Sequence, residues 1–342
     1  MADVARAAGV SVMTVSYAYN QPERVSPEAR AKVRQAADQL GYPGPHPGAR
    51  SLRRGHAGSV GVVLGEHLSY AFDDPQAARF LAGVADVCAS HGLGLMLLPI
   101  TGAAADVDRI AEAAVDGFVV WTTSDDDPVI DAVAATGLPA VVHGGPRRQG
   151  LFFVAIDDLA AARAVAAEAF ATARRPAVLS FPVDRARVPG IRWGPSPEEA
   201  TYRVTRQRLR GMRDAWQHLG GDWSQVQVAI CASNSTAEAE ERVVELLTGP
   251  DAPDAVAAMS DELALGVLRA AAHLNRRIPG DLTVTGWDNT AQAGPAGLTT
   301  IGQSLRDQGA HCARLALDER PDHRYKPEWT LIRRESTSEA SG

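Results

Sequence analysis

The stretch VARAAGVSVMTVSYAYNQ, residues 4–21, places two short helix-forming segments on either side of a single glycine near the N-terminus. Asp3 can accept hydrogen bonds from the free N–H groups at the start of a helix, so we expect it to cap a first helix over residues 4–8. Gly9 follows at once, and glycine most readily adopts the left-handed conformation in which helices end. Gly9 is therefore expected to form a turn between two helices.

The second helix is expected over residues 12–18, because Ser11 can cap it and apolar residues recur at helical spacing. Ala5 is small enough for close approach of the helices, and Val15 supplies an apolar anchor between them. These features are typical of a helix-turn-helix, which places its second helix in the major groove of DNA. An alanine-rich helical hairpin with no role in DNA binding has the same spacing and stays open as an alternative.

A third helix is expected to begin at residues 26–28. Ser26 is a hydroxyl cap, Pro27 suits the first helical position, and Glu28 places an acid in the first turn. This helix is expected to end near Gly41, so the predicted helical head spans residues 1–42.

The distribution of charge favours DNA as the partner of this head. Residues 1–54 contain eight Lys and Arg against four Asp and Glu, a net charge of +4. Because the whole chain carries −7, the remainder carries −11. A cationic head on an anionic body is suited to contact phosphates through the head alone.

Length and composition indicate a soluble chain of two or three domains, with 342 residues of which 45% are hydrophobic and 22% charged. No run approaches the about 18 apolar residues that span a bilayer, and no export signal is visible, so we expect a cytoplasmic protein without a membrane partner. The three cysteines form no CxxC pair, which predicts reduced, buried thiols and neither a disulfide framework nor a metal site. They are Cys88, Cys231 and Cys312.

The run DVARAAGVSVMTVSYAYNQPERVSPEARAKVRQAADQLGY, residues 3–42, followed by ARSLRRG, residues 49–55, resembles the DNA-binding head and hinge of the lactose/galactose repressor (LacI/GalR) family of bacterial regulators. The resemblance covers almost the whole chain. It implies that Val12, Met13 and Tyr17 read bases in the major groove. It also implies contacts to phosphates from four further residues, namely Ser11, Thr14, Ser16 and Asn20.

Tyr17 departs from the pattern of this family. Many relatives carry arginine there, which pairs with guanine through two hydrogen bonds, whereas tyrosine offers one hydroxyl and an aromatic face. A different operator base is therefore expected at this position.

The segment PGPHPG, residues 43–48, has the composition of a Pro/Gly linker. The following ARSLRR matches the short hinge helix that in relatives folds only on operator DNA. By this resemblance Leu52 is the wedge that enters the minor groove and Arg50 also lies at the DNA. An ordinary linker leucine among solvated arginines is the alternative.

Beyond residue 58 the chain alternates apolar runs with helical segments, which is typical of parallel sheets covered on both faces. Two such lobes fit the length, and ligands of open parallel sheets bind beyond the carboxyl ends of the strands. The runs are SVGVVLG, GLGLMLLP, GFVVWTT, PAVVHGG, FFVAI, PAVLSF, VQVAIC, AVAAMS and LTVTGWD. Near the C-terminus EWTLIRRES is also strand-like.

The loops after these runs supply candidates for an effector site between the lobes. Aromatic faces stack on the C–H groups of a polyhydroxylated ring, while carboxylates and an arginine hold its hydroxyls. Arg208 is included because it resembles an arginine that relatives use on sugar hydroxyls or a carboxylate. The candidates are Phe72, Asp74, Trp121, Arg208, Asn234, Ser260, Trp287 and Asp288.

Several of these residues have a structural alternative. Asp74, Asp261 and the cluster at 124–127 precede helical segments, where Ser and Asp are good caps. In the loop after PAVV, Gly144 stands where relatives often carry an aspartate. The neighbouring His143 is a candidate substitute, with a structural histidine as the alternative.

Two other classes of protein are alternatives to a DNA-binding regulator. An enzyme is not supported, because the sequence has no GxSxG elbow, Walker loop, HExxH or metal-spaced His/Cys cluster. A periplasmic solute-binding module shares the two-lobed body, but it lacks a DNA-binding head and carries an export signal.

The sequence therefore predicts an N-terminal all-α helix-turn-helix head and an α/β, two-lobed, periplasmic-binding-protein-like body with parallel sheets. We expect the head at 1–42, a linker and hinge helix at 43–58, the effector-binding and dimerisation body at 59–335 and a disordered tail at 336–342. The expected function is a ligand-responsive, nucleoid-associated transcriptional repressor. Its expected partners are double-stranded operator DNA, a sugar or related metabolite and a second copy of the chain, with no cofactor and no catalytic residue.

Overall fold

The computed structural model describes residues 1–44, 56–65, 72, 74–319 and 325–337. The chain divides into two compact units, residues 1–58 and 59–342. The predicted hinge residues Arg50 and Leu52 lie outside the described residues.

The first unit is the predicted helical head. Gly9 ends the first helix with a φ of 65°, and its N–H donates to the carbonyl groups of Ala5 and Arg6. Ser11 accepts a hydrogen bond from the N–H of Thr14 at 3.0 Å, which confirms the second cap. The elements are α1 (Ala2–Ala8), α2 (Val12–Asn20), the 3-10 turn η1 (Pro22–Arg24) and α3 (Pro27–Gln39).

The predicted cap at Asp3 is wrong. Helix α1 begins two residues earlier than predicted, at Ala2, so that Met1 is the N-cap residue and makes no side-chain capping bond. Asp3 lies in the first turn and is 3.3 Å from Arg6 in an exposed ion pair. An acid in the first turn still interacts favourably with the helix dipole.

A small core of valine and alanine holds the three helices together. Val15 is fully buried between them, as the helix-turn-helix pattern predicts. Ser26 caps α3 and Tyr42 packs edge-on against Tyr19, with ring centres 6.1 Å apart. The buried set is Val4, Ala5, Val15, Val33, Ala36 and Ala37.

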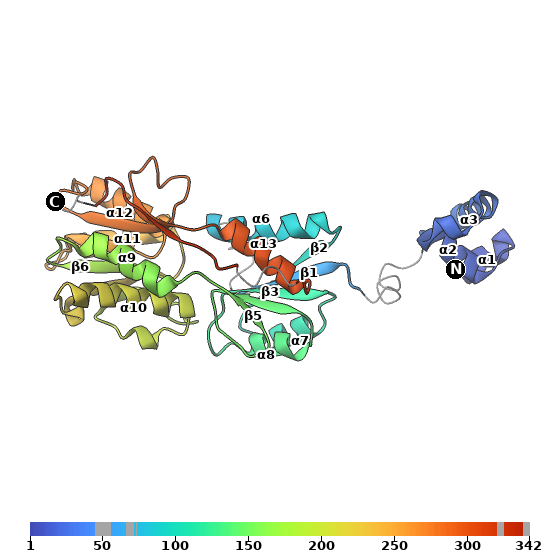
Figure 1. The fold of residues 1–342 in the computed structure, drawn as a ribbon, viewed down its shortest axis with the longest axis horizontal. Helices are drawn as coiled ribbons and strands as arrows, with labels where there is room; N and C mark the ends of the chain where they lie inside the picture. Colours follow the sequence, from blue (N-terminus) through green and yellow to red (C-terminus); the bar gives the residue numbers. More distant parts are fainter. Residues whose placement is uncertain (45–55, 66–71, 73, 320–324, 338–342) are drawn as a thin grey trace. The chain divides into compact units, whose positions relative to one another are not determined.

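The second unit is the body, which contains two α/β lobes (Figure 1). The sheet of the first lobe has five strands in the order β2-β1-β3-β4-β5, all parallel. The elements of this lobe are β1 (Ser59–Leu64), α6 (Pro75–Ser90), β2 (Gly94–Pro99), α7 (Ala105–Ala111), β3 (Gly117–Trp121), α8 (Pro128–Ala135), β4 (Ala140–His143), β5 (Phe152–Val154) and α13 (Leu305–Ala316).

The sheet of the second lobe has seven strands in the order β12-β11-β10-β9-β6-β8-β7, of which the two edge strands run antiparallel to their neighbours. Helices α9 and α10 pack on each other, as do α11 and α12. The elements are α9 (Asp158–Phe170), β6 (Pro176–Ser180), β7 (Gly190–Trp193), η2 (Pro197–Glu199), α10 (Arg203–His218), η3 (Trp223–Gln225), β8 (Gln227–Ile230), α11 (Thr236–Thr248), β9 (Ala255–Ala258), α12 (Asp261–His273), β10 (Thr283–Asp288), β11 (Thr299–Gly302) and β12 (Thr330–Ile332).

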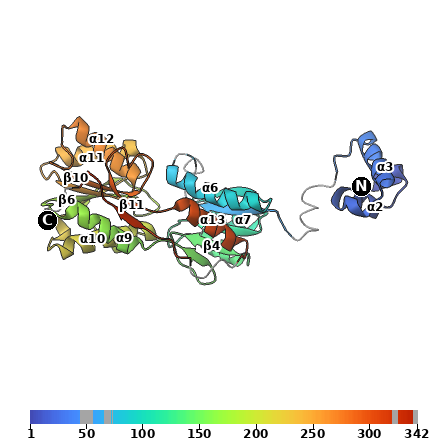
Figure 2. The same cartoon turned by 45° about the horizontal axis from the view of Figure 1, so that its top comes forward.

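The chain crosses between the lobes more than once. It passes to the second lobe between β5 and α9, returns between β11 and α13, and passes again between α13 and β12. Figures 1 and 2 therefore show α13 beside α6 in the first lobe, although it follows the strands of the second. These crossings bring residues that are far apart in sequence to the junction of the lobes.

Every apolar run identified above forms a strand, and the strand predicted in EWTLIRRES is β12. Strands β7 and β11 were not predicted, because they are short and carry polar residues. Residues 336 and 337, which were predicted to begin a disordered tail, are instead part of the folded body. Ser336 and Thr337 are buried, and Ser336 donates to the carbonyl of Val284 at 2.6 Å.

No helix in the described part of the chain is long and apolar enough to cross a membrane.

Helices α6 and α13 pack closely through glycines. A Cβ atom at Gly83 would lie 1.9 Å from the carbonyl oxygen of Arg306, and one at Gly309 would lie 2.1 Å from that of Phe80. Neither position has room for a side chain while the two helices stay in contact. The glycines thus allow a helix from the end of the chain to dock on the first lobe.

Gly309→Ala is expected to lower the free energy of unfolding by about 1–3 kcal/mol, because the helices must separate to admit a methyl group. Chemical unfolding in urea measures the change. Gly294→Ala is the matched control, since a Cβ there meets nothing within 4 Å. Equal urea midpoints for the two variants would contradict the close packing of α6 on α13.

Candidate functional site

Helix α2 presents an exposed apolar surface. The side chains of Val12 and Met13 are 49% and 63% exposed, although both are hydrophobic. Tyr17 lies one turn further along and is partly buried, with the guanidinium of Arg24 5.7 Å from its ring centre. Exposed apolar and aromatic groups on a recognition helix can contact base edges and thymine methyl groups.

The four residues predicted to contact phosphates fall into two pairs. Ser11 and Thr14 lie at the start of α2, where free N–H groups favour an anion, and their hydroxyl groups are 2.9 Å apart. Ser16 is buried, and Asn20 donates to its carbonyl oxygen at 2.9 Å. In this conformation Ser16 and Asn20 face the helix and its core more than the solvent.

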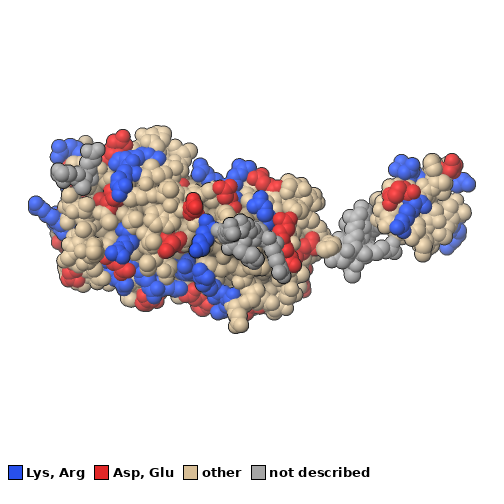
Figure 3. Space-filling model, viewed as in Figure 1, with Lys and Arg blue, Asp and Glu red and all other residues tan. Residues whose placement is uncertain are grey.

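Charged side chains of both signs are scattered over the visible face of the body, and both signs also lie at the surface of the head (Figure 3). Among the described residues of the third helix, Arg30, Lys32 and Arg34 are at least partly exposed. They place positive charge on α3, whereas α2 itself carries no Lys or Arg.

A cavity of about 120 Å³ lies between the lobes, at the carboxyl ends of the strands. Its walls come from both lobes, with β3, β4 and α6 on one side and α9, α10 and β10 on the other. Five of the predicted effector residues line it, namely Asp74, Trp121, Arg208, Asn234 and Asp288.

The other three predicted effector residues do not line this cavity. Phe72 is 70% exposed. Ser260 is fully buried, caps α12, and donates to the side-chain oxygen of Asn234 at 2.6 Å. Trp287 is fully buried beneath Arg208, whose guanidinium carbon is 3.8 Å from its ring centre. Ser260 and Trp287 therefore position cavity residues from behind.

Arg208 is held by groups of the second lobe. Its Nε donates to Asp158 at 3.1 Å, and its Nη1 donates to the carbonyl of Met259. Burial raises the pKa of Asp158, and the positive charge of Arg208 opposes this shift. Asp158 was not predicted from the sequence, although the pair of acids at 157–158 directly follows a strand and was a usable signal.

Asp74 is both a helix cap and a contact between the lobes. One carboxylate oxygen accepts hydrogen bonds from the N–H groups of Gln76 and Ala77 at 2.7 and 3.1 Å. The other oxygen accepts from the amide of Asn234 in the second lobe at 2.7 Å. The structural and functional interpretations of Asp74 are therefore compatible.

The first lobe contributes an aromatic wall. The rings of Trp121 and His143 stack with centres 5.0 Å apart and planes 10° apart, and Phe80 packs against both. Gly144 has a φ of 77°, and a Cβ there would lie 2.4 Å from the hydroxyl oxygen of Thr122. The aspartate that relatives often carry at this position would not fit here.

Asp288 ends β10 with a φ of 103° and accepts a hydrogen bond from Gln303 at 2.7 Å. Burial raises the pKa of Asp288 well above its usual value, despite the nearby charge of Arg208. Asp261, in contrast, is structural, since it accepts from the hydroxyl of Thr300 and the N–H of Thr290.

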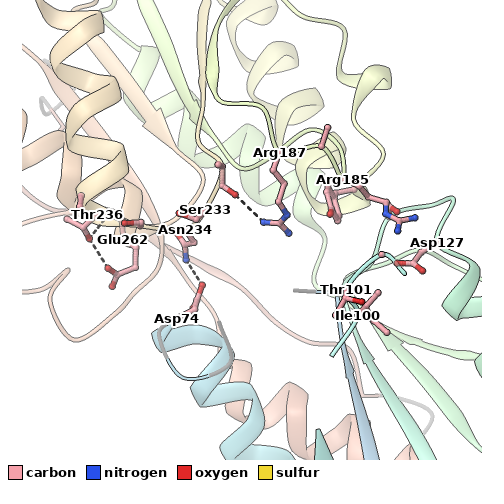
Figure 4. Close-up of a pocket in the computed structure, with 18 of the residues that line it drawn as sticks. Asp74, Ile100, Thr101, Asp127, Arg185, Arg187, Ser233, Asn234, Thr236 and Glu262 are labelled. Carbon is pink, nitrogen blue, oxygen red and sulfur yellow. Dashed lines mark hydrogen bonds between the residues drawn. The ribbon is translucent and has the colours of Figure 1, made fainter. Parts of the chain in front are cut away.

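A wider cavity of about 1010 Å³ adjoins the first and shares Asp74 and Asn234 with it. Figure 4 shows Arg185 and Arg187 of the second lobe on one side and Asp127 and Thr101 of the first lobe opposite. Buried polar groups converge on the smaller cavity, which makes it the better candidate for recognition of a ligand. No group of three or more potential metal ligands occurs among the residues that the structure describes.

Comparisons with known proteins agree with this architecture. Residues 1–44 match the family described as bacterial regulatory proteins, lacI family, and residues 190–337 match a periplasmic binding protein-like domain. The chain is 38% identical to the HTH-type transcriptional regulator IpsA of Corynebacterium glutamicum over 341 residues, which are 97% of this chain and 94% of that protein.

Two solved structures share the fold. The transcriptional regulator CelR in complex with cellobiose is 26% identical, with a TM-score of 0.65 and 98% of each chain covered. The lac repressor dimer bound to operator and an anti-inducer is 21% identical, with a TM-score of 0.73 and 98% of each chain covered.

A helix-turn-helix head and a two-lobed body define a DNA-binding transcriptional regulator with an effector-binding domain. The chain belongs to the LacI family of bacterial regulators, as its head and hinge sequence suggests. The proteins that it matches are regulators of transcription rather than enzymes.

Replacing Asp158 by leucine is expected to lower the free energy of unfolding of the body by about 3–5 kcal/mol, because Arg208 then stays buried without its carboxylate. Urea unfolding followed by tryptophan fluorescence measures this. Glu198→Gln, which removes an exposed partner of Arg210, is the control and should leave the midpoint near that of the wild type. Similar midpoints for the two variants would show that Asp158 does not neutralise Arg208.

Proposed function

We propose that this chain is a repressor whose affinity for operator DNA is changed by a small sugar-like or related metabolite bound between the two lobes. The observation that carries the proposal is the cavity of about 120 Å³, on which buried polar side chains from both lobes converge. A ligand that contacts both walls favours one arrangement of the lobes over another.

The chemistry of the cavity suits a polyhydroxylated ring. Trp121 offers an aromatic face on one side, and Asp74, Asn234 and Asp288 offer oxygen acceptors around it. Stacking on C–H groups and hydrogen bonds from hydroxyl groups are the interactions that such a ring makes. The similar regulator CelR has been solved with cellobiose, which supports this class of effector.

In this proposal the head, residues 1–42, reads the operator. The linker and hinge, residues 43–58, couple effector binding in the body to operator binding by the head. A single head reads one half-site, so a homodimer formed through the body is proposed for a two-fold operator. The lac repressor, which has the same fold, has been solved as a dimer on its operator. Leu52 acts in this proposal as the minor-groove wedge and Arg50 as a further DNA contact.

Effector and operator are coupled through the equilibrium between lobe arrangements. The effector changes operator affinity only by as much as its own affinity differs between these arrangements. Action on operator DNA places the protein in the cytoplasm, at the nucleoid.

Tyr17→Arg tests the assignment of α2 as the reading helix. Arginine pairs with guanine through two hydrogen bonds, so preference at one symmetric pair of operator positions is expected to shift toward guanine by about 1–3 kcal/mol. Selection from random operators with wild type and variant measures this. Identical consensus sequences would mean that Tyr17 points away from the bases and that Val12 and Met13, or DNA shape, determine the choice.

Asp288→Asn tests the effector site. Replacing one carboxyl oxygen by an amide group removes an acceptor that faces the effector, which should weaken effector binding by about 1–3 kcal/mol and leave operator affinity without effector unchanged. Thermal shift over a panel of sugars and metabolites identifies a ligand, because one present at about 100 times its Kd adds ~2.7 kcal/mol. Phe72→Ala is the control, since this side chain does not line the cavity. A folded Asp288→Asn protein with a normal response would make Asp288 structural.

A further inference from the structure

His143 lines the cavity, and its two ring nitrogens have different surroundings. Its Nε2 lies 2.9 Å from the side-chain oxygen of Gln308. Its Nδ1 is buried and has no hydrogen-bond partner among the described residues. A buried polar atom without a partner is unfavourable, and here it belongs to a residue that lines the cavity. Nδ1 is therefore placed to bond with a ligand.

A chain of hydrogen bonds determines which nitrogen carries the proton. Gln303 donates its amide N–H to Asp288 at 2.7 Å, and Gln308 donates its own amide N–H to the oxygen of Gln303 at 3.1 Å. The amide oxygen of Gln308 remains as the atom facing His143, and it can only accept. His143 must then donate from Nε2, so Nδ1 carries a lone pair.

The ring is neutral as well as oriented. Burial, together with the positive charge of Arg208, lowers the pKa of His143 to about 4, although the hydrogen bond to Gln308 opposes this shift. A neutral ring with its proton on Nε2 is a hydrogen-bond acceptor at Nδ1.

The neighbouring residue cannot supply an acceptor in its place. Gly144 has no side chain and no room for one, because a Cβ would lie 2.4 Å from the hydroxyl oxygen of Thr122. Beside Trp121 the acceptor is thus the imidazole ring, whose orientation is fixed by its parallel stacking on that residue.

We propose that Nδ1 of His143 accepts a hydrogen bond from a hydroxyl group of the effector, and that the cavity selects an uncharged polyol over the corresponding sugar acid. The proposal rests on the proposed function, because it assumes that the effector occupies this cavity. A carboxylate ligand would meet the Nδ1 lone pair and the carboxyl groups of Asp74 and Asp158. The positive charge of Arg208 is already engaged by Asp158.

The test uses the full chain with ¹⁵N-labelled histidine and the probes D-glucose, D-ribose and cellobiose, each measured by calorimetry and NMR. D-Gluconate and D-glucuronate are the charged counterparts. The His143 signals are assigned by their loss in His143→Phe. We expect a neutral probe to bind and to move the Nδ1 signal of His143, while the two acids do not bind.

His143→Phe keeps a ring against Trp121 but removes Nδ1, so the affinity for the bound probe should fall about tenfold. His218→Phe, at an exposed position on α10, should leave it unchanged. A urea midpoint equal to that of the wild type shows that the body of each variant is folded.

The outcomes separate this proposal from the one on which it rests. A neutral probe that binds wild type and His143→Phe equally, with Nδ1 unmoved, overturns the role of His143 and leaves the proposed effector site intact. Binding of an acid in preference to its neutral counterpart overturns the selectivity. Operator binding with no response to any neutral probe contradicts the sugar-like effector itself, and the polyol class with it.

Discussion

One buried positive charge, the guanidinium of Arg208, determines how the second lobe builds its side of the cavity. A charge taken out of water must be paired and hydrogen-bonded, or the fold loses several kcal/mol. Asp158 at the start of α9 and the carbonyl of Met259 after β9 accept its hydrogen bonds, and Trp287 of β10 lies under its plane. These partners come from three elements of one lobe, so this wall is assembled before any ligand binds.

The first lobe forms the opposite wall of the cavity, which is aromatic where the second lobe is charged. Trp121, His143 and Phe80 are packed ring against ring, and the histidine is neutral. A few polar bonds join the walls, such as that between Asp74 and Asn234. Because a hydrogen bond to a carboxylate is worth only about 1.5–3 kcal/mol, a ligand that contacts both walls can change the balance between lobe arrangements.

The sequence predicted most of the fold, because its main determinants are local. Buried parallel strands are continuous apolar runs, and caps such as Ser11 are set by neighbouring residues. The short edge strand β7 escaped detection because half-exposed edges need no apolar pattern. Met1 is the cap residue instead of Asp3, because the sequence determines the end of a helix only to within one or two residues.

The site was less predictable, because it depends on which chain segments meet. The rule that ligands bind at the carboxyl ends of strands selected Trp121 and Asp288, which line the cavity. The same rule selected Trp287, whose side chain alternates to the buried face. Gln303 and Gln308 could not be found in this way. They reach the cavity because α13 returns to the first lobe, and that crossing has no local signal in the sequence.

Strand β1 is the first element of the body after the linker. The linker leads into β1, whose first residue is fixed by bonds from Ser59 to Asp116 and to the carbonyl of Ala114. At the other end of the same strand, Gly65 lines the wider cavity beside Asp74. The strand is buried and paired on both sides, so it cannot deform easily along its length. These contacts favour movement of the first lobe as a rigid body over deformation of β1.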